Sequence, residues 1–136
     1  MQVFQPSMYI PVPDGWFDKE SYTVIAPDGQ ANVIASSEPL DRDIDSAEYA
    51  AVQGELLRRE FPGYRELSFV PTQAFGRSGY VRRFGWHPSD GVPVTQVQMY
   101  YAAGGRGYTA TATSPTTTFG RFEANLAAVL SGLTID

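Results

Sequence analysis

Two segments in the middle of the chain alternate strictly between two kinds of side chain. Residues 95–101 read TQVQMYY, and residues 108–113 read YTATAT. An alternation with a period of two is typical of a strand with one drier face and one wetter face. Between the two segments, residues 102–107 read AAGGRG and supply glycines that accept positive φ. The pattern predicts a central β-hairpin whose wetter face carries glutamines, a tyrosine and threonines.

Shorter β-rich runs predict the other strands, at residues 4–12, 21–26, 31–36, 64–70 and 80–86. The first run contains Pro6, which is tolerated at the edge of a sheet. The sequence PDG at residues 27–29 separates the second run from the third and predicts a hairpin. The sequence PSDG at residues 88–91 predicts a tight reversal into the central hairpin, so that three consecutive strands form an antiparallel meander.

Two segments have helical periodicity. Asp45 is a candidate N-cap, with Glu48 three residues later, for a helix from Ser46 to about Arg59 that ends before FPG at residues 61–63. Its predicted apolar stripe consists of Tyr49, Val52, Leu56 and Leu57. The threonines at 116–118 are candidate caps for a last helix. Its predicted stripe consists of Phe119, Phe122, Leu126, Val129, Leu130 and Leu133.

The order of these elements is one strand, a hairpin, a helix, four strands and a helix. Most connections are too short for a parallel crossover. The sequence therefore predicts a single domain over residues 1–136 of the α+β class, a twisted, mainly antiparallel sheet of six or seven strands flanked by two principal helices. Two helices on one face would leave the other face open, whereas helices on opposite faces would reduce the open surface to a groove.

Composition limits the partners that we expect. The net charge of -5 and the scarcity of clustered Lys and Arg argue against nucleic acid. No apolar run approaches the ~20 residues of a membrane span, so we expect no stable membrane insertion. The N-terminus has no charged region followed by an apolar one, and a cytoplasmic protein is the simplest interpretation. A mature domain whose signal peptide has been removed would have the same sequence, so that alternative stays open.

The residues that could carry catalysis or bind a metal are few. There is one histidine, His87, and no cysteine, so neither a metal site nor a cofactor is expected. Ser89 and Asp90 could formally complete a triad with His87, but no nucleophile elbow surrounds them. The acidic run at residues 41–45 lacks the glycine and the closing glutamate of a calcium loop. The sequence therefore predicts no enzyme, and a hydrolase using His87 is kept as a third hypothesis.

The wetter face of the central hairpin is the candidate binding surface, because Lys and Glu would be the usual choice for a merely solvated one. Amide groups donate and accept hydrogen bonds, while rings and threonine methyls make dry contacts, which suits an apolar peptide. The predicted partner-binding residues are Gln96, Gln98, Tyr100, Thr109, Thr111, Tyr80, Arg82, Phe84, Trp86 and Ile34. Two alternatives remain: a bulge could invert the strand at residues 80–86, and the aromatic residues could be core beneath the last helix.

The whole chain resembles the DcrB-like domain of the Mog1/PsbP-like superfamily and is most similar to the Eag-type chaperones of type VI secretion effectors. The residues that carry the resemblance are Val12-Pro13-Asp14-Gly15-Trp16 with Asp18, residues 33–40, Glu48-Tyr49-Ala50 with Gln53 and Leu57, Gly79 with Phe84 and Trp86, residues 96–100 and residues 108–112.

The resemblance implies a flanked antiparallel sheet, no enzymatic activity and a homodimer. It also implies that the partner is the hydrophobic N-terminal, transmembrane-like segment of a secreted effector, held on the sheet until export. We therefore expect a cytoplasmic chaperone or adaptor. The alternative is an extracytoplasmic accessory or lipoprotein-type DcrB-like domain whose ligand is unknown.

Overall fold

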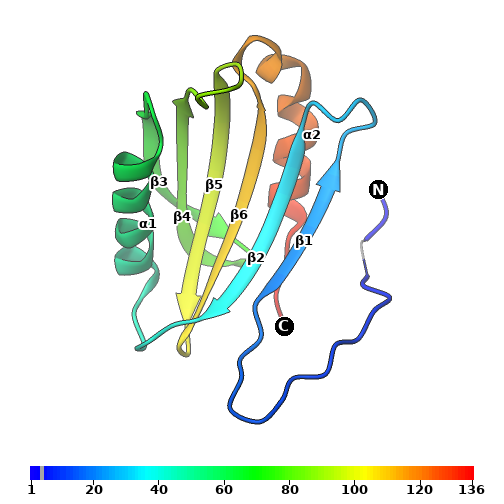
Figure 1. Cartoon of the computed structure of the whole chain (residues 1–136), viewed down its shortest axis with the longest axis vertical. Coiled ribbons are helices and arrows are strands. Elements are labelled where there is room, and N and C mark those ends of the chain that lie inside the picture. Colours follow the sequence, from blue (N-terminus) through cyan, green and yellow to red (C-terminus); the bar gives the residue numbers. More distant parts are fainter. Residues whose placement is uncertain (4) are drawn as a thin grey trace.

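The computed structural model describes residues 1–3 and 5–136, which form one six-stranded sheet and two α-helices (Figure 1). The elements in chain order are β1 (Glu20–Ile25), β2 (Asn32–Pro39), α1 (Ser46–Glu60), β3 (Arg65–Ala74), β4 (Arg77–Trp86), β5 (Val94–Ala103), β6 (Arg106–Pro115), a 3-10 turn η1 (Thr116–Thr118) and α2 (Phe119–Gly132). All neighbouring strands are antiparallel, in the order β1-β2-β6-β5-β4-β3. The predicted α+β class and open twisted sheet are confirmed.

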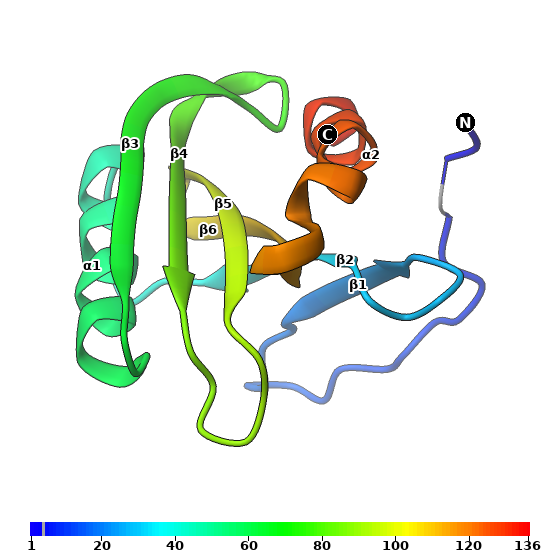
Figure 2. The ribbon, with the colours of Figure 1, turned by 90° about the horizontal axis from the view of Figure 1, so that it is seen from above.

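The two helices cover opposite faces of the sheet. Seen from above, the sheet bends so that β3 and β4 stand steeply against β1 and β2, with α2 inside the bend and α1 outside it (Figure 2). The larger core lies between α2 and the sheet, where Phe122 and Leu126 pack against the alanines of β6. Because α2 lies on the inner face, α1 is the helix that covers the other face of the sheet in the described part of the chain.

Helix α1 begins and ends where its caps predict. The carboxylate of Asp45 accepts the backbone N–H of Glu48 at 2.8 Å. The side that faces the sheet agrees with the predicted stripe at Tyr49 and Leu57 and differs from it at Val52. Its buried residues are Tyr49, Ala50, Gly54 and Leu57, whereas Val52 is 47% exposed and Leu56 is partly buried. The expectation for Val52 is wrong because Ala50 and Gly54 are the residues that lie against Arg82 of the sheet, and Val52 is on the exposed side.

Two-residue turns join the last four strands in pairs. Gly104 and Gly105 have φ of 61° and 75°, and Phe75 and Gly76 have φ of 58° and 74°. Positive φ at both positions matches the twist of the flanking strands. Both strands beside the second turn are longer than predicted, since β3 continues through Pro71 to Ala74 and β4 begins at Arg77. An edge strand accommodates a proline, because the side on which the N–H is missing can face away from the ladder.

The predicted strand at residues 4–12 is wrong for the described residues 5–12, which lie outside the sheet as extended chain (Figure 1); Phe4 lies outside the described residues. Pro6 and Pro11 each remove a backbone donor there. The hairpin predicted from residues 21–26 and 31–36 is confirmed as β1 and β2.

Candidate functional site: the sheet face beneath and beside α1

The register of the sheet brings all the predicted partner-binding side chains onto one face. Across the ladders the pairs are Tyr80↔Tyr100, Arg82↔Gln98, Phe84↔Gln96, Tyr100↔Thr109, Gln98↔Thr111, Gln96↔Thr113 and Ile34↔Thr111. No register shift interrupts β4 and β5, so the inversion that a bulge would have caused does not occur. The irregularity lies instead in β3, between Glu66 and Ser68. This face, which also carries α1, is called the polar face below.

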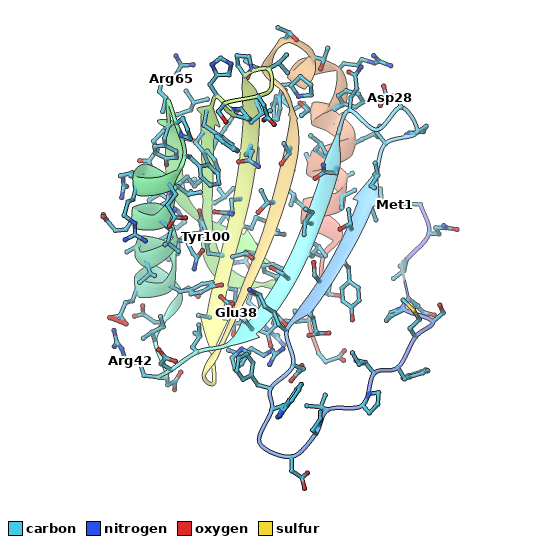
Figure 3. All side chains as sticks on the ribbon, viewed as in Figure 1. Met1, Asp28, Glu38, Arg42, Arg65 and Tyr100 are labelled. Carbon is cyan, nitrogen blue, oxygen red and sulfur yellow. The ribbon has the colours of Figure 1, made fainter. Side chains whose placement is uncertain are left out.

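Helix α1 divides the polar face into two parts. Arg82 is 2% exposed and Phe84 and Tyr100 are 0% exposed, because α1 lies over them. Figure 3 shows Tyr100 on the side of the sheet that α1 occupies. The prediction that these three side chains contact a partner is corrected: while α1 is in place, nothing lying on the sheet reaches them. The alternative that the aromatic residues are core is true of this part, but the covering helix is α1, not the last helix.

The covered half is defined by Tyr80, Arg82, Phe84, Trp86 and Tyr100. At its centre Arg82 donates to the Glu66 carboxylate at 2.9 Å, to the backbone carbonyl of Ala50 at 3.2 Å and to the Tyr100 hydroxyl at 2.7 Å. The guanidinium also lies 4.2 Å from the centroid of the Phe69 ring. A buried charge is tolerated only when it is paired and fully hydrogen-bonded. These contacts therefore explain how a sheet arginine can lie beneath a helix.

The fit between α1 and Arg82 depends on Gly54. A Cβ added at Gly54 would lie 2.7 Å from one terminal nitrogen of the Arg82 guanidinium. Glycine in a helix interior costs about 1 kcal/mol relative to alanine, so space for the guanidinium outweighs helix propensity here.

Aromatic side chains close the rim of the covered half. The Trp86 and Phe61 ring centroids are 4.1 Å apart, and Tyr80 stacks on Phe69 at 5.4 Å. Trp86 also donates its indole N–H to Gln96 Oε1 at 2.7 Å. Trp86 and Tyr80 are partly buried by these contacts, so only their edges are available to a partner.

The open half lies beside α1 on β5, β6 and β2, and consists of Gln96, Gln98, Thr109, Thr111, Thr113, Ile34 and Ser36. Gln96 Nε2 donates to the Thr113 hydroxyl at 2.7 Å, and Gln98 Nε2 donates to the Thr111 hydroxyl at 2.9 Å. An amide nitrogen carries two protons and a hydroxyl carries one. Each of these pairs therefore keeps an N–H and an O–H that the contacts just described do not use.

Hydrogen bonds to the covered half fix the orientation of both glutamines. Tyr100 donates to Gln98 Oε1, as Trp86 does to Gln96 Oε1. With the oxygens engaged from the side of α1, the nitrogens point toward β6. The open half is thereby biased toward hydrogen-bond donors, which suits a partner that offers acceptors.

Ile34 and Ser36 extend the open half onto β2. Ile34 is 41% exposed, and the hydroxyls of Ser36 and Thr109 are 2.9 Å apart. Ser36 was absent from the predicted site. The alternation along residues 31–36 could have identified it, because Ser36 is two residues from Ile34 and shares its face. None of the seven side chains is charged, which distinguishes the open half from an ordinary solvated strand surface.

The two tyrosines at the contact between α1 and the sheet have raised pKa values. Burial raises the pKa of Tyr100 to about 12, although the neighbouring Arg82 cation opposes the shift. Burial also raises the pKa of Tyr49, which packs edge-on against Tyr100 at 6.5 Å. At neutral pH Tyr100 is therefore a hydrogen-bond donor to Gln98, as the orientation of that amide requires.

The third hypothesis, a hydrolase that uses His87, concerns a residue in the loop between β4 and β5. His87 Nε2 lies 3.0 Å from the backbone carbonyl oxygen of Gly91, across the loop that joins β4 to β5. This contact holds the ring within its own loop. Within residues 1–3 and 5–136, no group of three or more His, Cys, Asp or Glu side chains is arranged to hold a metal ion.

Comparisons with known proteins bear on the fold. The sequence matches no protein-family model, and no curated protein matches it. Among solved structures, the chain is similar to protein PA94 of Pseudomonas aeruginosa, described as a protein of unknown function and candidate regulator, with a TM-score of 0.80, 17% identity and coverage of 100% of this chain and 97% of that one. It is also similar to LpqN of Mycobacterium tuberculosis, described as involved in cell envelope biogenesis, with a TM-score of 0.58, 18% identity and coverage of 90% and 78%.

At these identities the similarity establishes a shared small α+β fold. These comparisons do not show that the chain belongs to the DcrB-like or Eag-type families. Across the part of the chain that the structure describes, neither helix has the length and apolar character of a membrane span.

Proposed function

We propose that this protein is a non-enzymatic chaperone or adaptor that holds an apolar helical segment of another protein on the open half of the polar face. The observation that carries the proposal is the chemistry of that half: seven uncharged side chains, with methyl groups for dry contact and amide and hydroxyl protons left over. A helix rich in small residues brings its backbone close to such a surface and offers carbonyl or serine oxygens as acceptors.

The resemblance of the chain to Eag-type chaperones supports a more specific form of the proposal. In that form the client is the transmembrane-like N-terminal segment of a secreted effector, and binding takes place in the cytoplasm before export. A surface that shields an apolar segment from water fits this task, because an exposed segment of this kind would aggregate.

A second candidate is an accessory role in the cell envelope. The structural similarity to LpqN, which is described as involved in cell envelope biogenesis, favours it. The two candidate functions use the same open half but require the protein to be in different compartments, the cytoplasm or the cell envelope. Fractionation of the native host, with detection of the chain in cytoplasm or envelope, distinguishes them.

The binding experiment uses a soluble carrier protein fused to a 20-residue segment of Leu, Ala, Gly and Ser, and the same carrier with a Gln- and Lys-rich segment of equal length. We expect the full chain to bind the first carrier and not the second. Thr111→Arg and Ile34→Arg place a cation in the open half and should weaken binding at least tenfold. Ala127→Arg, on the exposed side of α2, is the control. Failure to bind the apolar carrier, or equal binding by all variants, contradicts the proposal.

A further inference from the structure

One charged side chain lies at the end of the open half. Alternate residues of a strand share a face, so β2 presents Asn32, Ile34, Ser36 and Glu38 on the polar face. The side chains that β5 and β6 present there are amides, hydroxyls, aliphatic groups and one tyrosine. Among the positions of β2, β5 and β6 on this face, Glu38 is therefore the one that carries a charge.

The carboxylate of Glu38 lies near the border between the open half and α1. Glu38 pairs with Gly107 of β6 across the ladder, and the ring of Tyr49 from α1 lies over Gly107, where an added Cβ would come within 2.5 Å of the ring. Burial raises the pKa of Tyr49, and the negative charge of Glu38 adds to the rise. The charge of Glu38 is thus felt at the side of α1 along which the open half runs.

The partner of Glu38 within the chain holds it only weakly. Lys19 Nζ lies 3.2 Å from Glu38 Oε2, and the two side chains are 64% and 35% exposed. Ion pairs between exposed side chains contribute little to stability, because water and salt screen them. A cation brought by a partner can therefore replace Lys19 at this carboxylate.

The loop that follows β2 makes this end of the open half more negative. Residues 41–48 contain four carboxylates and one arginine. Asp43 accepts a backbone N–H of the β5–β6 turn at 3.2 Å, which holds the loop against the end of the sheet. Asp45 and Glu48 are explained by the start of α1, where negative charge is favourable. No helix terminus explains Glu38, which belongs to a strand.

The other end of the open half is uncharged on the strands. There Asn32 of β2 lies opposite Thr113 of β6. Figure 3 shows Glu38 and Arg42 toward one end of the long axis of the molecule and Arg65 toward the other. At about 3.3 Å per residue, Asn32 and Glu38 are roughly 20 Å apart along β2, which equals about 13 residues of an α-helix. An apolar helix of 20 residues is therefore long enough to lie along the open half and bring one of its ends to Glu38.

We propose that Glu38 recognises a cationic flank on the N-terminal side of the apolar segment, and so sets the direction in which that segment lies on the open half. The proposal rests on the proposed function. A lysine or arginine of the flank donates a charge-assisted hydrogen bond to the carboxylate. The N-terminus of a helix also carries a positive partial charge, whereas the reverse direction would bring carbonyl oxygens against Glu38.

The test compares three carriers that share the same 20-residue apolar segment. Two lysines stand directly before the segment in the first carrier and directly after it in the second, and two glutamines stand before it in the third. At low salt the full chain should bind the first carrier about threefold to fivefold tighter than the other two, which is the size of one surface ion pair. The difference should shrink at about 0.5 M salt, because the charges are screened.

Glu38→Gln should remove the preference for the first carrier and leave binding of the glutamine carrier unchanged, which also shows that the variant is folded. Glu123→Gln is the matched control, because Glu123 lies in an exposed ion pair with Arg83 on the opposite face of the sheet. This variant should keep the preference.

The outcomes separate this inference from the proposed function. Failure of the wild type to bind any of the three carriers would contradict the proposed function and, with it, the role of Glu38. Equal binding of the three carriers, tighter binding of the second, or a preference that survives Glu38→Gln overturns the inference alone. Loss of all binding in Glu38→Gln would assign the residue a structural role and overturn it as well.

Discussion

The covered half and the open half of the polar face lie on the same side of continuous strands, yet only one of them is buried. Arg82 and Tyr100 lie beneath α1 and hold that helix on the sheet, whereas Gln98 and Thr111, on the same face, remain beside it. The difference comes from the helix and not from the strands, because all four residues belong to continuous antiparallel ladders. The comparison shows that a polar strand face becomes core or stays accessible according to what packs on it.

A chain of hydrogen bonds connects the two halves. Glu66 binds Arg82, Arg82 donates to Tyr100, Tyr100 donates to Gln98, and Gln98 donates to Thr111. Substitutions in the covered half should therefore change stability first, and substitutions in the open half should change binding with little effect on stability. The predictions below test that separation, beginning with the largest effect.

Arg82→Ala should lower the free energy of unfolding by about 3–5 kcal/mol, because it removes the buried partner of Glu66 and leaves space against Gly54. Chemical denaturation of wild type and variant measures the difference. Arg83→Ala is the control from the opposite face of the same strand. Its ion pair with Glu123 is exposed, so the loss there should be no more than about 1 kcal/mol. Similar losses at both positions would show that Arg82 does not hold α1 in place.

Gly54→Ala should destabilise the protein by about 1–3 kcal/mol despite the better helix propensity of alanine, since its Cβ meets the buried guanidinium. Gly120→Ala in α2 meets nothing within 4 Å and should be neutral or stabilising by up to about 1 kcal/mol. The midpoint of thermal unfolding of each variant provides the measurement. Stabilisation by Gly54→Ala would mean that α1 packs less closely than the structure shows.

Alkaline pH should destabilise the covered half through its tyrosines. The pKa of Tyr100 rises from 10.0 to about 12 on burial, so the unfolded chain loses this proton first. The contribution of Tyr100 to stability should be constant below pH 10 and fall by about 1.4 kcal/mol per pH unit between pH 10 and 12. Tyr100→Phe should make the slope shallower, whereas Tyr9→Phe, at an exposed position outside the sheet, should not. Denaturant titrations at several pH values measure the slopes, and equal slopes for the two variants would contradict the prediction.

Thr111→Val should have the smallest effect on stability, within about 0.5–1 kcal/mol, because the Gln98 amide that loses its acceptor is partly exposed to water. The same substitution should weaken binding of the apolar carrier by several-fold, since it removes a hydroxyl from the open half. Parallel measurements of unfolding and binding separate the two effects. A large loss of stability without any change in binding would reverse the roles assigned to the halves.

Much of this arrangement could be predicted from periodicity. The alternation of the central hairpin correctly assigned Gln96, Gln98 and the threonines to one face, and the Asp45 cap located the start of α1. What periodicity could not show is which helix covers which strands. Arg82 was predicted to lie on the surface. Its burial depends on Glu66 and Gly54, which are distant in sequence, so no pattern of neighbouring residues indicates it. The prediction of a strand at residues 4–12 was wrong over the described residues 5–12 for a related reason. Alternation of side chains does not show which neighbouring strand would pair with the segment.

Hydrogen–deuterium exchange of the full chain, with and without the apolar carrier, tests most directly whether the open half alone receives the client. The account predicts slower exchange in β6 and β2 on binding, with the amides of α1 unchanged, because α1 stays over Arg82 and Tyr100. Faster exchange along α1 on binding would show that the helix leaves the sheet and that the covered half is the binding surface. That result would contradict the division of the face on which the proposed function depends.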